Sequence, residues 1–509
     1  MNLNLTLREK IGQLVLYSME GNTLDQDTLN TLSDYKIGNI IHFGNNVTGF
    51  DDAKALNAQL SEVISANCSG VRPLISIDHE GGRVMRFARD FTWFPSAMAL
   101  GAIDDPSLTR SVGRAMGTEL RAAGFNLSLG PVVDVLVNPA NPAGGVRMFG
   151  SSEKLVARHA VQLASGLQES GVMACVKHFP GCGDTEQDSH YFLPTVEFTL
   201  ERLEEVELVP YREAFAAGAA DALMTTHILF PKVEPDPVPA TMSPVILTGL
   251  LRGKLGFKGI IISDGIHMKA IADHYGVENG CIAAINAGVD LICLGSGGAG
   301  YQASQKSCLE AMYQAALSGK LSMARIDEAV SRILAFKEKY GKDFPAAPDF
   351  AAHAQINQTA CRRAATWLTA CREPISGSVL CVGAPVYELA FGLTHADPRA
   401  IPFAQLAGEA LGAPWAMLDG SPLPDYDTLV IGVQRLTAEG PELAAAHAAL
   451  HAGKKAAFIF LGQPQGAKLL PEGCPAVCVY TRTPQSVRAA LNVLTGKENA
   501  EGVLPTILV

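Results

Sequence analysis

Charged side chains are scarce in this sequence. They make up 18% of its 509 residues, below the quarter or so that is usual for soluble domains. The 40 basic residues are outnumbered by 51 acidic ones, which gives a net charge of −11, and no lysine or arginine cluster stands out. Phosphate backbones and anionic membranes are poor partners for such a chain, and we do not expect it to bind nucleic acid.

Long apolar runs are missing as well. No stretch approaches the roughly 18 apolar residues that a membrane helix needs, and the N-terminus lacks the basic and apolar segments of a secretion signal. We therefore expect a cytoplasmic protein with no membrane partner. The eleven cysteines fit that compartment, because several, such as Cys175, Cys293 and Cys381, lie in apolar runs where a reduced thiol is a small hydrophobe. They form no CxxC pair and no zinc-ribbon spacing.

The chain is too long for one hydrophobic core, since cores stop growing near roughly 250–300 residues. Short strand-like runs alternate with helical segments through its first two-thirds, and this alternation over about 300 residues is typical of a (β/α)8 barrel, or TIM barrel. The predicted strands are residues 11–17, 37–44, 73–78, 126–133, 173–178, 222–227, 259–264 and 289–294. Residues 200–217 and 326–340 are predicted to be amphipathic helices, and Asp104-Asp105-Pro106 to begin another.

A smaller α/β sandwich is predicted to follow the barrel. Residues 343–354 are rich in proline and alanine with little periodicity, which indicates a linker. Beyond it we expect helices at 359–371 and 441–452 and strands at 378–382, 428–433, 456–461 and 476–480. The predicted division is a catalytic barrel over 1–342, a linker and connecting helix over 343–374, and the sandwich domain over 375–509.

The densest group of polar side chains lies in residues 177–190, directly after the fifth predicted strand. On a barrel, strand C-termini and the loops that follow form the active-site face, so Lys177 and His178 are predicted to lie in the pocket. In Asp188-Ser189-His190 a carboxylate lies within reach of an imidazole, and it can orient the ring and raise its basicity for acid/base catalysis. The alternative is a solvated loop with ordinary turn chemistry.

Two aspartates end buried strands in the same way. Asp264 follows the apolar run 259–263 and can be a nucleophile, a metal ligand or merely a helix cap. Asp78 ends the third strand and is followed by Gly81 and Gly82, which allow a close approach of the backbone to a ligand or serve a tight turn. Arg147 and His227 complete the candidates, and each taken alone favours a structural role.

Two other patterns in the sequence indicate different chemistry. Residues 295–300 match GxGxxG, but no strand ending in an acidic residue follows about 20 residues on, as a dinucleotide fold requires, so we interpret them as a loop lining the pocket. A metal site is the stronger rival, although its spacing matches none of the standard zinc signatures. Its candidate ligands are His178, Cys182, Asp184, Asp188 and His190.

Taken together in order, these motifs resemble those of the β-N-acetylhexosaminidases of glycoside hydrolase family 3, the NagZ-like enzymes of cell-wall recycling. The resemblance covers nearly all of the first 340 residues and is carried by residues 77–84, 177–181, 183–185, 188–190, 263–264 and 268–270. Asp188-Ser189-His190 is the motif that separates the hexosaminidases from the β-glucosidases of that family. The second domain is similar, much more weakly, to the sandwich of two-domain members.

The resemblance implies a role for each candidate. Asp264 would be the nucleophile, His190 the acid/base and Asp188 its partner in a dyad. Sugar binding would fall to Asp78, Arg83, Arg147, Lys177 and His178. Retaining glycosidases usually pair two carboxylates, so a histidine would replace the second one here. No cofactor or metal is implied, and the expected partner is a small carbohydrate; the sequence makes no prediction of oligomeric state.

Some positions depart from the family pattern. Cys182 stands where the family usually has histidine, Gly265 and Met148 replace commoner alanine and serine, and residues 294–296 replace the usual hydrophobic-Met-Pro ending of the eighth strand. These changes leave every proposed catalytic group in place and affect the leaving-group side.

The predicted activity is the removal of terminal β-linked N-acetylglucosamine (GlcNAc) from peptidoglycan fragments, such as GlcNAc-anhydroMurNAc with or without peptide, through a covalent glycosyl-Asp264 intermediate. Three alternatives stay open at this point: a phosphorylase of the same fold, a metal-dependent hydrolase, and a sugar-binding protein without turnover. The phosphorylase stays an alternative because a histidine acid/base, unlike a carboxylate, does not repel an incoming phosphate dianion.

Overall fold

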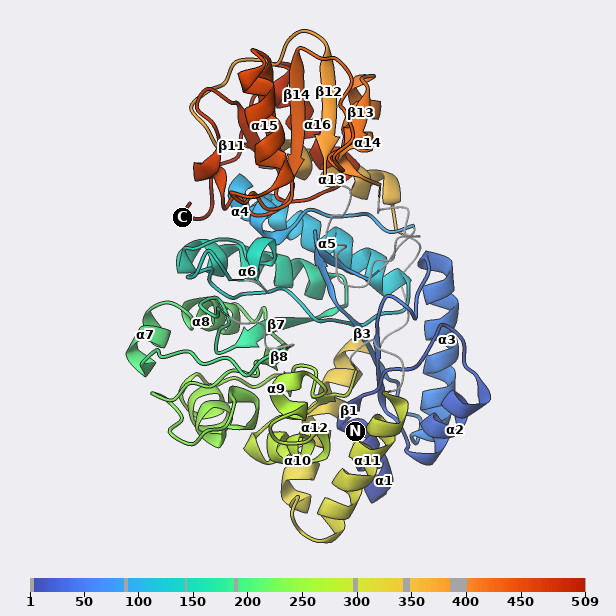
Figure 1. The fold of residues 1–509 in the computed structure, drawn as a ribbon. Helices are drawn as coiled ribbons and strands as arrows, with labels where there is room; N and C mark the ends of the chain where they lie inside the picture. Colours follow the sequence, from blue (N-terminus) through green and yellow to red (C-terminus); the bar gives the residue numbers. More distant parts are fainter. Residues whose placement is uncertain are drawn as a thin grey trace.

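The computed structural model describes residues 4–86, 90–141, 144–186, 191–295, 301–341, 348–384 and 401–508. Two sheets dominate the described chain. Residues from the N-terminus to the α12 helix (Met323–Tyr340) surround the first, and the remainder, coloured orange to red in Figure 1, is built on the second. No helix in these ranges is both long enough and apolar enough to span a membrane.

The first sheet is parallel and curled. Six strands pair in the order β2-β3-β6-β7-β8-β9, and β1 pairs with β10. Single bridges, Tyr17 to Ile40 and Ile262 to Leu291, join this pair to the two edges of the six. The strands are β1 (Val15–Leu16), β2 (Asn39–His42), β3 (Leu74–Ile77), β6 (Leu127–Ser128), β7 (Met173–Phe179), β8 (Ala222–Thr225), β9 (Ile260–Ile262) and β10 (Ile292–Cys293). Seven of the eight predicted strand segments contain one of them, and β7 extends one residue beyond the predicted segment 173–178.

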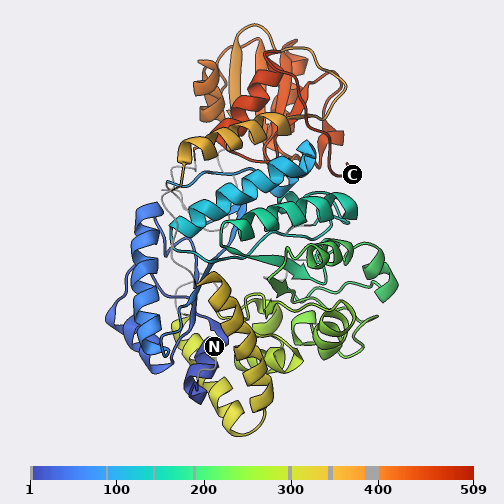
Figure 2. The ribbon, with the colours of Figure 1, turned by 180° about the vertical axis from the view of Figure 1, so that it is seen from behind.

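Helices cover the outer face of this sheet, as Figures 1 and 2 show from opposite sides. The helices of this part are α1 (Leu7–Gln13), α2 (Gln26–Asp34), α3 (Phe50–Asn67), α4 (Ala97–Ile103), α5 (Pro106–Ala122), α6 (Glu153–Glu169), α7 (Leu200–Glu205), α8 (Val209–Ala216), α9 (Lys269–Ala272), α10 (Val277–Ala287), α11 (Gln302–Leu317), α12 and a π-helix at Val245–Lys254. Of these, α4 lies between the two parts of the chain. Two 3-10 turns lie at Gly145–Arg147 and Ala240–Met242, and β4 (His79–Gly81) and β5 (Val84–Met85) form a small hairpin. As predicted, Asp105 caps α5 at its N-terminus and Pro106 occupies the first turn.

Two predicted elements of this part differ from the structure. The segment 11–17 was expected to be a strand, but its first three residues belong to α1, which a capping box between Thr6 and Glu9 starts early. The single helix expected over 200–217 is two helices, α7 and α8. Pro210, in the first turn of α8, has no amide hydrogen with which to continue the preceding helix, so the helix is interrupted before it.

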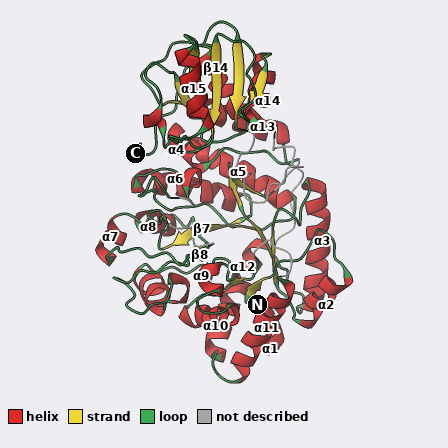
Figure 3. Ribbon diagram, viewed as in Figure 1, coloured by secondary structure: helices red, strands yellow, loops and turns green. Residues whose placement is uncertain are grey.

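The second sheet has six strands in the order β11-β16-β15-β14-β12-β13, parallel except for the β11–β16 pair. They are β11 (Thr366–Trp367), β12 (Val379–Gly383), β13 (Trp415–Met417), β14 (Thr428–Val433), β15 (Lys455–Phe460) and β16 (Ala476–Cys478). Helices α14 (Phe403–Leu411) and α16 (Pro484–Leu494) pack on one face and α15 (Pro441–His451) on the other, while α13 (Phe350–Ala364) leads in from the first sheet. Figure 3 shows these strands between helices.

The connection between the two parts is shorter than predicted. Asp349 caps α13, so residues 350–354 of the expected linker are helical. The helix expected over 359–371 ends at Ala364, because Thr366 and Trp367 pair with the last strand instead. The domain boundaries drawn from the sequence stay a prediction.

The two parts share an apolar core. Met98 of α4, together with Val146 and Met148 of the following loops, belongs to the same buried cluster as Phe458 and Tyr480 of the second sheet region. Hydrogen bonds reinforce it: the Ser96 hydroxyl donates to the carbonyl of Tyr480, 3.0 Å away, and the Ser151 amide donates to the Pro505 carbonyl at 3.0 Å. The second sheet therefore supports the segment that carries Arg147.

Candidate active site

Several candidate side chains meet at the carboxyl-terminal edge of the curled sheet. Asp78 follows β3 directly, Lys177 and His178 lie near the end of β7, and Asp264 comes two residues after β9. Because parallel strands end at the same edge, side chains that are up to 186 positions apart in the chain are gathered on one face. The structure thus brings together the groups that the sequence placed at strand ends.

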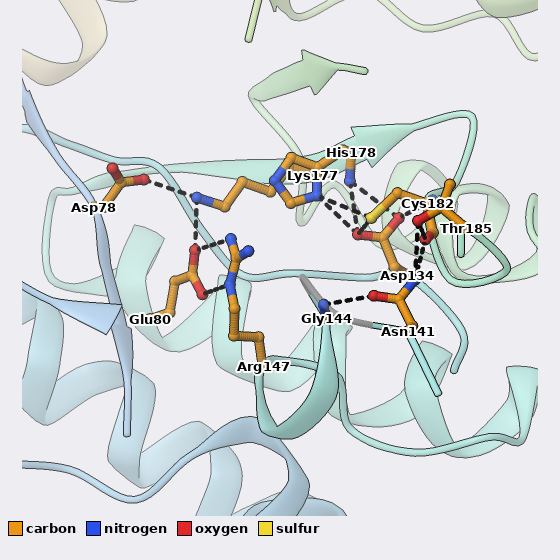
Figure 4. A network of polar contacts seen from close by, with 10 residues as sticks. All are labelled: Asp78, Glu80, Asp134, Asn141, Gly144, Arg147, Lys177, His178, Cys182 and Thr185. Atoms are coloured by element: carbon orange, nitrogen blue, oxygen red, sulfur yellow. Dashed lines mark hydrogen bonds and ion pairs between the residues drawn. The ribbon is translucent and has the colours of Figure 1, made fainter. Parts of the chain in front are cut away.

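A chain of alternating charges runs through this edge (Figure 4). The Lys177 ammonium donates to Asp78 Oδ1 at 2.8 Å and pairs with Glu80 Oε1 at 2.7 Å. Arg147 binds Glu80 with two parallel hydrogen bonds of 2.8 Å, and Arg86 donates to Asp78 Oδ2 at 2.8 Å. Bidentate contacts such as that between Arg147 and Glu80 fix the orientation of the carboxylate and stabilise its negative charge. We call these five residues the charged network.

The charged network is buried yet ionised. The Lys177 side chain is only 2% exposed. Burial opposes its charge, but Asp78 and Glu80 outweigh that effect and raise its pKa to about 12. Burial likewise opposes ionisation of Glu80, and Arg147 and Lys177 overcome it to lower the Glu80 pKa to about 2. The same competition holds the pKa of Asp78 far below its usual range. At neutral pH the network offers fixed donors and acceptors of the kind that sugar hydroxyls bind.

His178 is held by a carboxylate that the sequence analysis missed. Its Nδ1 lies 2.8 Å from Oδ2 of Asp134, a fully buried residue. Burial opposes ionisation of Asp134, but the charge of His178 and hydrogen bonds from His178 and Cys182 lower its pKa overall. The anion therefore accepts the Nδ1 hydrogen. His178 Nε2 has no hydrogen bond within the described ranges, and it is the ring atom available to a ligand.

Cys182, the departure from the family pattern, is tied to the same carboxylate. Its amide donates to Asp134 Oδ1 at 2.9 Å and its thiol to Oδ2 at 3.1 Å. Burial, together with the charge of Asp134, raises the pKa of the Cys182 thiol well above its usual value, so the sulfur is protonated at neutral pH. Its carbonyl accepts from the Asn141 side-chain amide at 2.7 Å, which fixes the loop from the other side.

Asp264 lies in a tight turn at the carboxyl-terminal edge of the curled sheet, just after β9. Its Oδ1 accepts the Gly265 amide at 2.7 Å. His227 binds Thr241 through Nδ1 at 2.8 Å and the Gly265 carbonyl through Nε2 at 3.1 Å. This buried histidine thus supports the turn after Asp264, in keeping with the structural role that the sequence favoured for it.

The other predicted site residues divide into two groups. Arg83 is half-buried in the β4–β5 turn, whereas the arginine that reaches Asp78 is Arg86. Asp188 and His190 lie outside the described residues, as do positions 296–300 of the predicted glycine-rich loop. Their roles stay predictions.

The structure regroups the candidate metal ligands. Of the five proposed from the sequence, His178 and Cys182 come together, and Asp134 joins them; their ligand atoms all lie within 4.8 Å of one another. Asp184 is not part of this group, which is the one potential metal cluster found in the residues that the structure describes.

Glu207 lies under the loop that carries Cys182. Its side chain lies where a Cβ added to Gly181 would meet it, and it pairs through Oε2 with Arg202 at 2.7 Å, while Oε1 is buried without a partner. Burial is the largest influence and raises the pKa to about 7, against the opposing charge of Arg202 and with a smaller contribution from Asp184.

This raised pKa predicts a pH-dependent stability. The folded state holds the Glu207 proton up to about pH 7, whereas the unfolded chain loses it near pH 4.3, so stability falls between these values, by up to roughly 4 kcal/mol. Glu207→Gln should therefore raise the free energy of unfolding by about 1–3 kcal/mol at pH 8 and change it little at pH 5. Urea unfolding at both pH values checks this; an equal change at both would contradict it.

The comparisons with known proteins agree with this geometry. A family model described as the N-terminal domain of glycosyl hydrolase family 3 matches residues 6–336. The chain belongs to this family. It is therefore a glycoside hydrolase, and the resemblance drawn from its motifs is confirmed.

Relatives within the family are similar over different lengths. The chain is 34% identical over 283 residues to β-hexosaminidase A of Pseudoalteromonas piscicida, which covers 53% of this chain and 47% of that protein. It is 35% identical over 286 residues to a β-hexosaminidase of Neisseria meningitidis serogroup C, covering 55% and 77%. Among solved structures, a family 3 β-N-acetylglucosaminidase from Paenibacillus sp. FPU-7 is 33% identical, with a TM-score of 0.88 and 99% of both chains covered. The chain thus spans just under half of the first of these relatives and nearly all of the last protein.

Proposed function

We propose that this glycoside hydrolase is a retaining exo-β-N-acetylglucosaminidase, with Asp264 as nucleophile, His190 as acid/base and Asp188 as its partner. The proposal rests above all on the charged network, which occupies the same strand-end edge as Asp264. It is supported by the similarity over 99% of the chain to a family 3 β-N-acetylglucosaminidase. We further propose that the curled sheet is a (β/α)8 barrel and that the second sheet forms an α/β sandwich domain.

The charged network is suited to hold the terminal sugar. Asp78 can accept hydrogen bonds from sugar hydroxyls while Lys177 and Arg147 donate to hydroxyl or acetamido oxygens. His178, oriented by Asp134, offers Nε2. Hydrogen bonds and ion pairs already hold these side chains in position, so few of them need to become ordered when substrate binds. The sugar carbon C1 can then be held in line with Asp264.

The chemistry then needs two proton transfers. Protonated His190 donates to the glycosidic oxygen as the C1–O bond breaks and Asp264 forms a bond to C1. The neutral imidazole next takes a proton from water, whose oxygen attacks C1 and releases Asp264, and two inversions give net retention. Asp188 would stabilise the imidazolium and hold its ring, as carboxylates commonly do for catalytic histidines.

The substrate proposed in more detail is a cytoplasmic peptidoglycan fragment ending in β-linked GlcNAc. The named relatives are β-hexosaminidases, which supports the terminal GlcNAc. The peptidoglycan fragment rests on the resemblance of the motifs to those of the NagZ-like enzymes. Reversed selectivity, with fast release from simple chitin oligomers and none from GlcNAc-anhydroMurNAc, would remove this part of the proposal and leave the enzymatic class intact.

A phosphorylase of the same fold is the principal alternative. A β-glucoside phosphorylase is 21% identical with a TM-score of 0.85, a likeness that bears on the fold alone. The product distinguishes the two, because phosphorolysis yields a sugar 1-phosphate where hydrolysis yields the free sugar. A metal-dependent hydrolase would instead lose its activity to chelators.

Sugar specificity is the first test. We expect kcat/KM for an aryl β-GlcNAc glycoside to exceed that for the matching β-glucoside at least about tenfold, or about 1.4 kcal/mol of transition-state binding. Rates measured on both substrates, with and without phosphate, check this. Equal turnover of the two sugars, or a requirement for phosphate, would contradict the proposed activity.

The support of Arg147 by the second sheet gives another test. Gly145 has φ +52° and lies against the Gln463 side-chain amide, so an added Cβ would overlap it. Gly145→Ala should displace Arg147 and lower kcat/KM at least about tenfold, since misplacement by about 1 Å can cost a hundredfold.

The control is the double variant Gly145→Ala/Gln463→Ala, which removes the overlap and leaves only a backbone cost of roughly 1–2 kcal/mol. It should recover part of the lost activity. If the double variant is no better than the single one, the contact with Gln463 does not hold Arg147 in place.

A further inference from the structure

Asp134, His178 and Cys182 present three different donor atoms to one point. Asp134 Oδ2 lies 2.8 Å from His178 Nδ1 and 3.1 Å from Cys182 Sγ, and the sulfur and the nitrogen are 3.7 Å apart. Carboxylate, imidazole and thiolate together form a ligand set for a borderline-soft cation. We call these residues the Asp-His-Cys cluster.

The spacing of the cluster suits zinc. Zinc binds oxygen and nitrogen at about 2.0–2.2 Å and sulfur at about 2.3 Å, usually in tetrahedral geometry. Given the three separations, a cation just outside the plane of the donor atoms lies at roughly these distances from all of them. The 2.8 Å and 3.1 Å separations from Asp134 Oδ2 correspond to angles of roughly 90°, so the donors must move apart by a few tenths of an ångström to reach tetrahedral geometry. The cation would replace the two hydrogens that now bridge the cluster, one on His178 Nδ1 and one on the Cys182 sulfur, and both would leave to solvent.

The donors are held in position by their neighbours. Asp134 is anionic and accepts the amides of His178, at 3.2 Å, and Cys182, at 2.9 Å. The Cys182 carbonyl is bound by Asn141, whose own Oδ1 accepts the Gly144 amide at 2.7 Å. Such contacts behind the ligands are what orients them in established metal sites. The cysteine itself is a partly exposed residue.

We propose that the Asp-His-Cys cluster binds one thiophilic divalent cation, such as zinc, cadmium or cobalt, with a fourth position open to water or a sugar oxygen. The site shares His178 with the proposed sugar-binding groups, but it involves neither Asp264 nor His190 and does not depend on their proposed roles. One consequence reaches the substrate: a cation on Nδ1 leaves a neutral His178 with its hydrogen on Nε2. In the cation-free protein a neutral ring carries that hydrogen on Nδ1, so Nε2 changes from acceptor to donor.

The test uses the full chain with its thiols reduced and metals removed. Titration with cobalt(II) should produce a sulfur-to-metal charge-transfer band and tetrahedral visible bands that saturate at one equivalent, and zinc should bleach them. Cys182→Ser should lose the charge-transfer band and bind cobalt at least about tenfold more weakly. Cys371→Ser is the matched control, because Cys371 is also partly exposed but lies outside the cluster, and it should behave as wild type.

X-ray absorption of the zinc-loaded wild-type protein gives a second measurement that needs no variant. It should show one sulfur at about 2.3 Å and lighter ligands at about 2.0–2.1 Å. The proposal is overturned if wild type gives no charge-transfer band, if Cys182→Ser keeps it, or if zinc has only oxygen and nitrogen neighbours. In that event the cluster is a hydrogen-bonded support for His178 and nothing more.

Discussion

Asp264→Ala is expected to lower kcat/KM for an aryl β-GlcNAc glycoside at least about a thousandfold, with the fold intact. A nucleophile that bonds to C1 acts only in the transition state and the intermediate, so its loss removes rate and leaves ground-state sugar binding largely unchanged. The fold is expected to stay intact, because the substitution adds no atoms and removes the Gly265 amide contact within the same turn. Steady-state kinetics and thermal unfolding check the two halves of this prediction.

Asp273→Ala is the matched control for that variant. Asp273 is exposed just after α9, nine positions along the chain, and should tolerate the same substitution with no change in rate. An Asp264→Ala protein that is folded and still within about tenfold of wild type would show that another group attacks C1.

His190→Ala should have an effect that depends on the leaving group. A sugar alcohol leaves poorly and needs the proton from His190, so glycosylation should slow severely, by at least about a hundredfold. A nitrophenolate departs without help and should lose much less in this step. Deglycosylation still lacks its base, so a burst of nitrophenol followed by slow turnover is expected in stopped-flow measurements.

Two variants serve as comparisons for His190. Asp188→Ala should show a milder form of the same pattern, since the imidazole remains but is poorly oriented and less basic. His274→Ala, which alters an exposed histidine after α9, should change nothing. Equal losses on both substrates without a burst would mean that His190 binds sugar or metal and that the acid lies elsewhere.

The fold was largely predictable because its pattern is local. The strands of the curled sheet lie in short apolar runs, and each of the eight segments predicted from those runs overlaps one strand. The predicted strand bounds are wrong where a helix cap outweighs an apolar run. At residues 11–13 the helix that Thr6 caps continues into residues whose apolar pattern predicts a strand. The break between α7 and α8 could have been predicted from Pro210. The amphipathic pattern alone indicates one continuous helix.

The candidate site was predictable at the strand ends and much less so between them. Asp78, Lys177 and His178 were identified because each ends a buried strand. The pairing of Arg147 with Glu80, 67 positions apart, depends on how two loops meet, and no spacing in the sequence reveals it. Asp134 follows the fourth predicted strand directly, so the rule that identified Asp78 would have identified it too.

Trapping the glycosyl-enzyme is the measurement that tests the central proposal most directly. A fluorinated GlcNAc donor with a good leaving group should form the covalent intermediate faster than it is hydrolysed. We predict a mass gain of one fluorinated glycosyl group per chain, found by peptide sequencing on Asp264 and absent from Asp264→Ala. A label on another carboxylate, such as Asp78, or turnover of the donor without any covalent species, would contradict it.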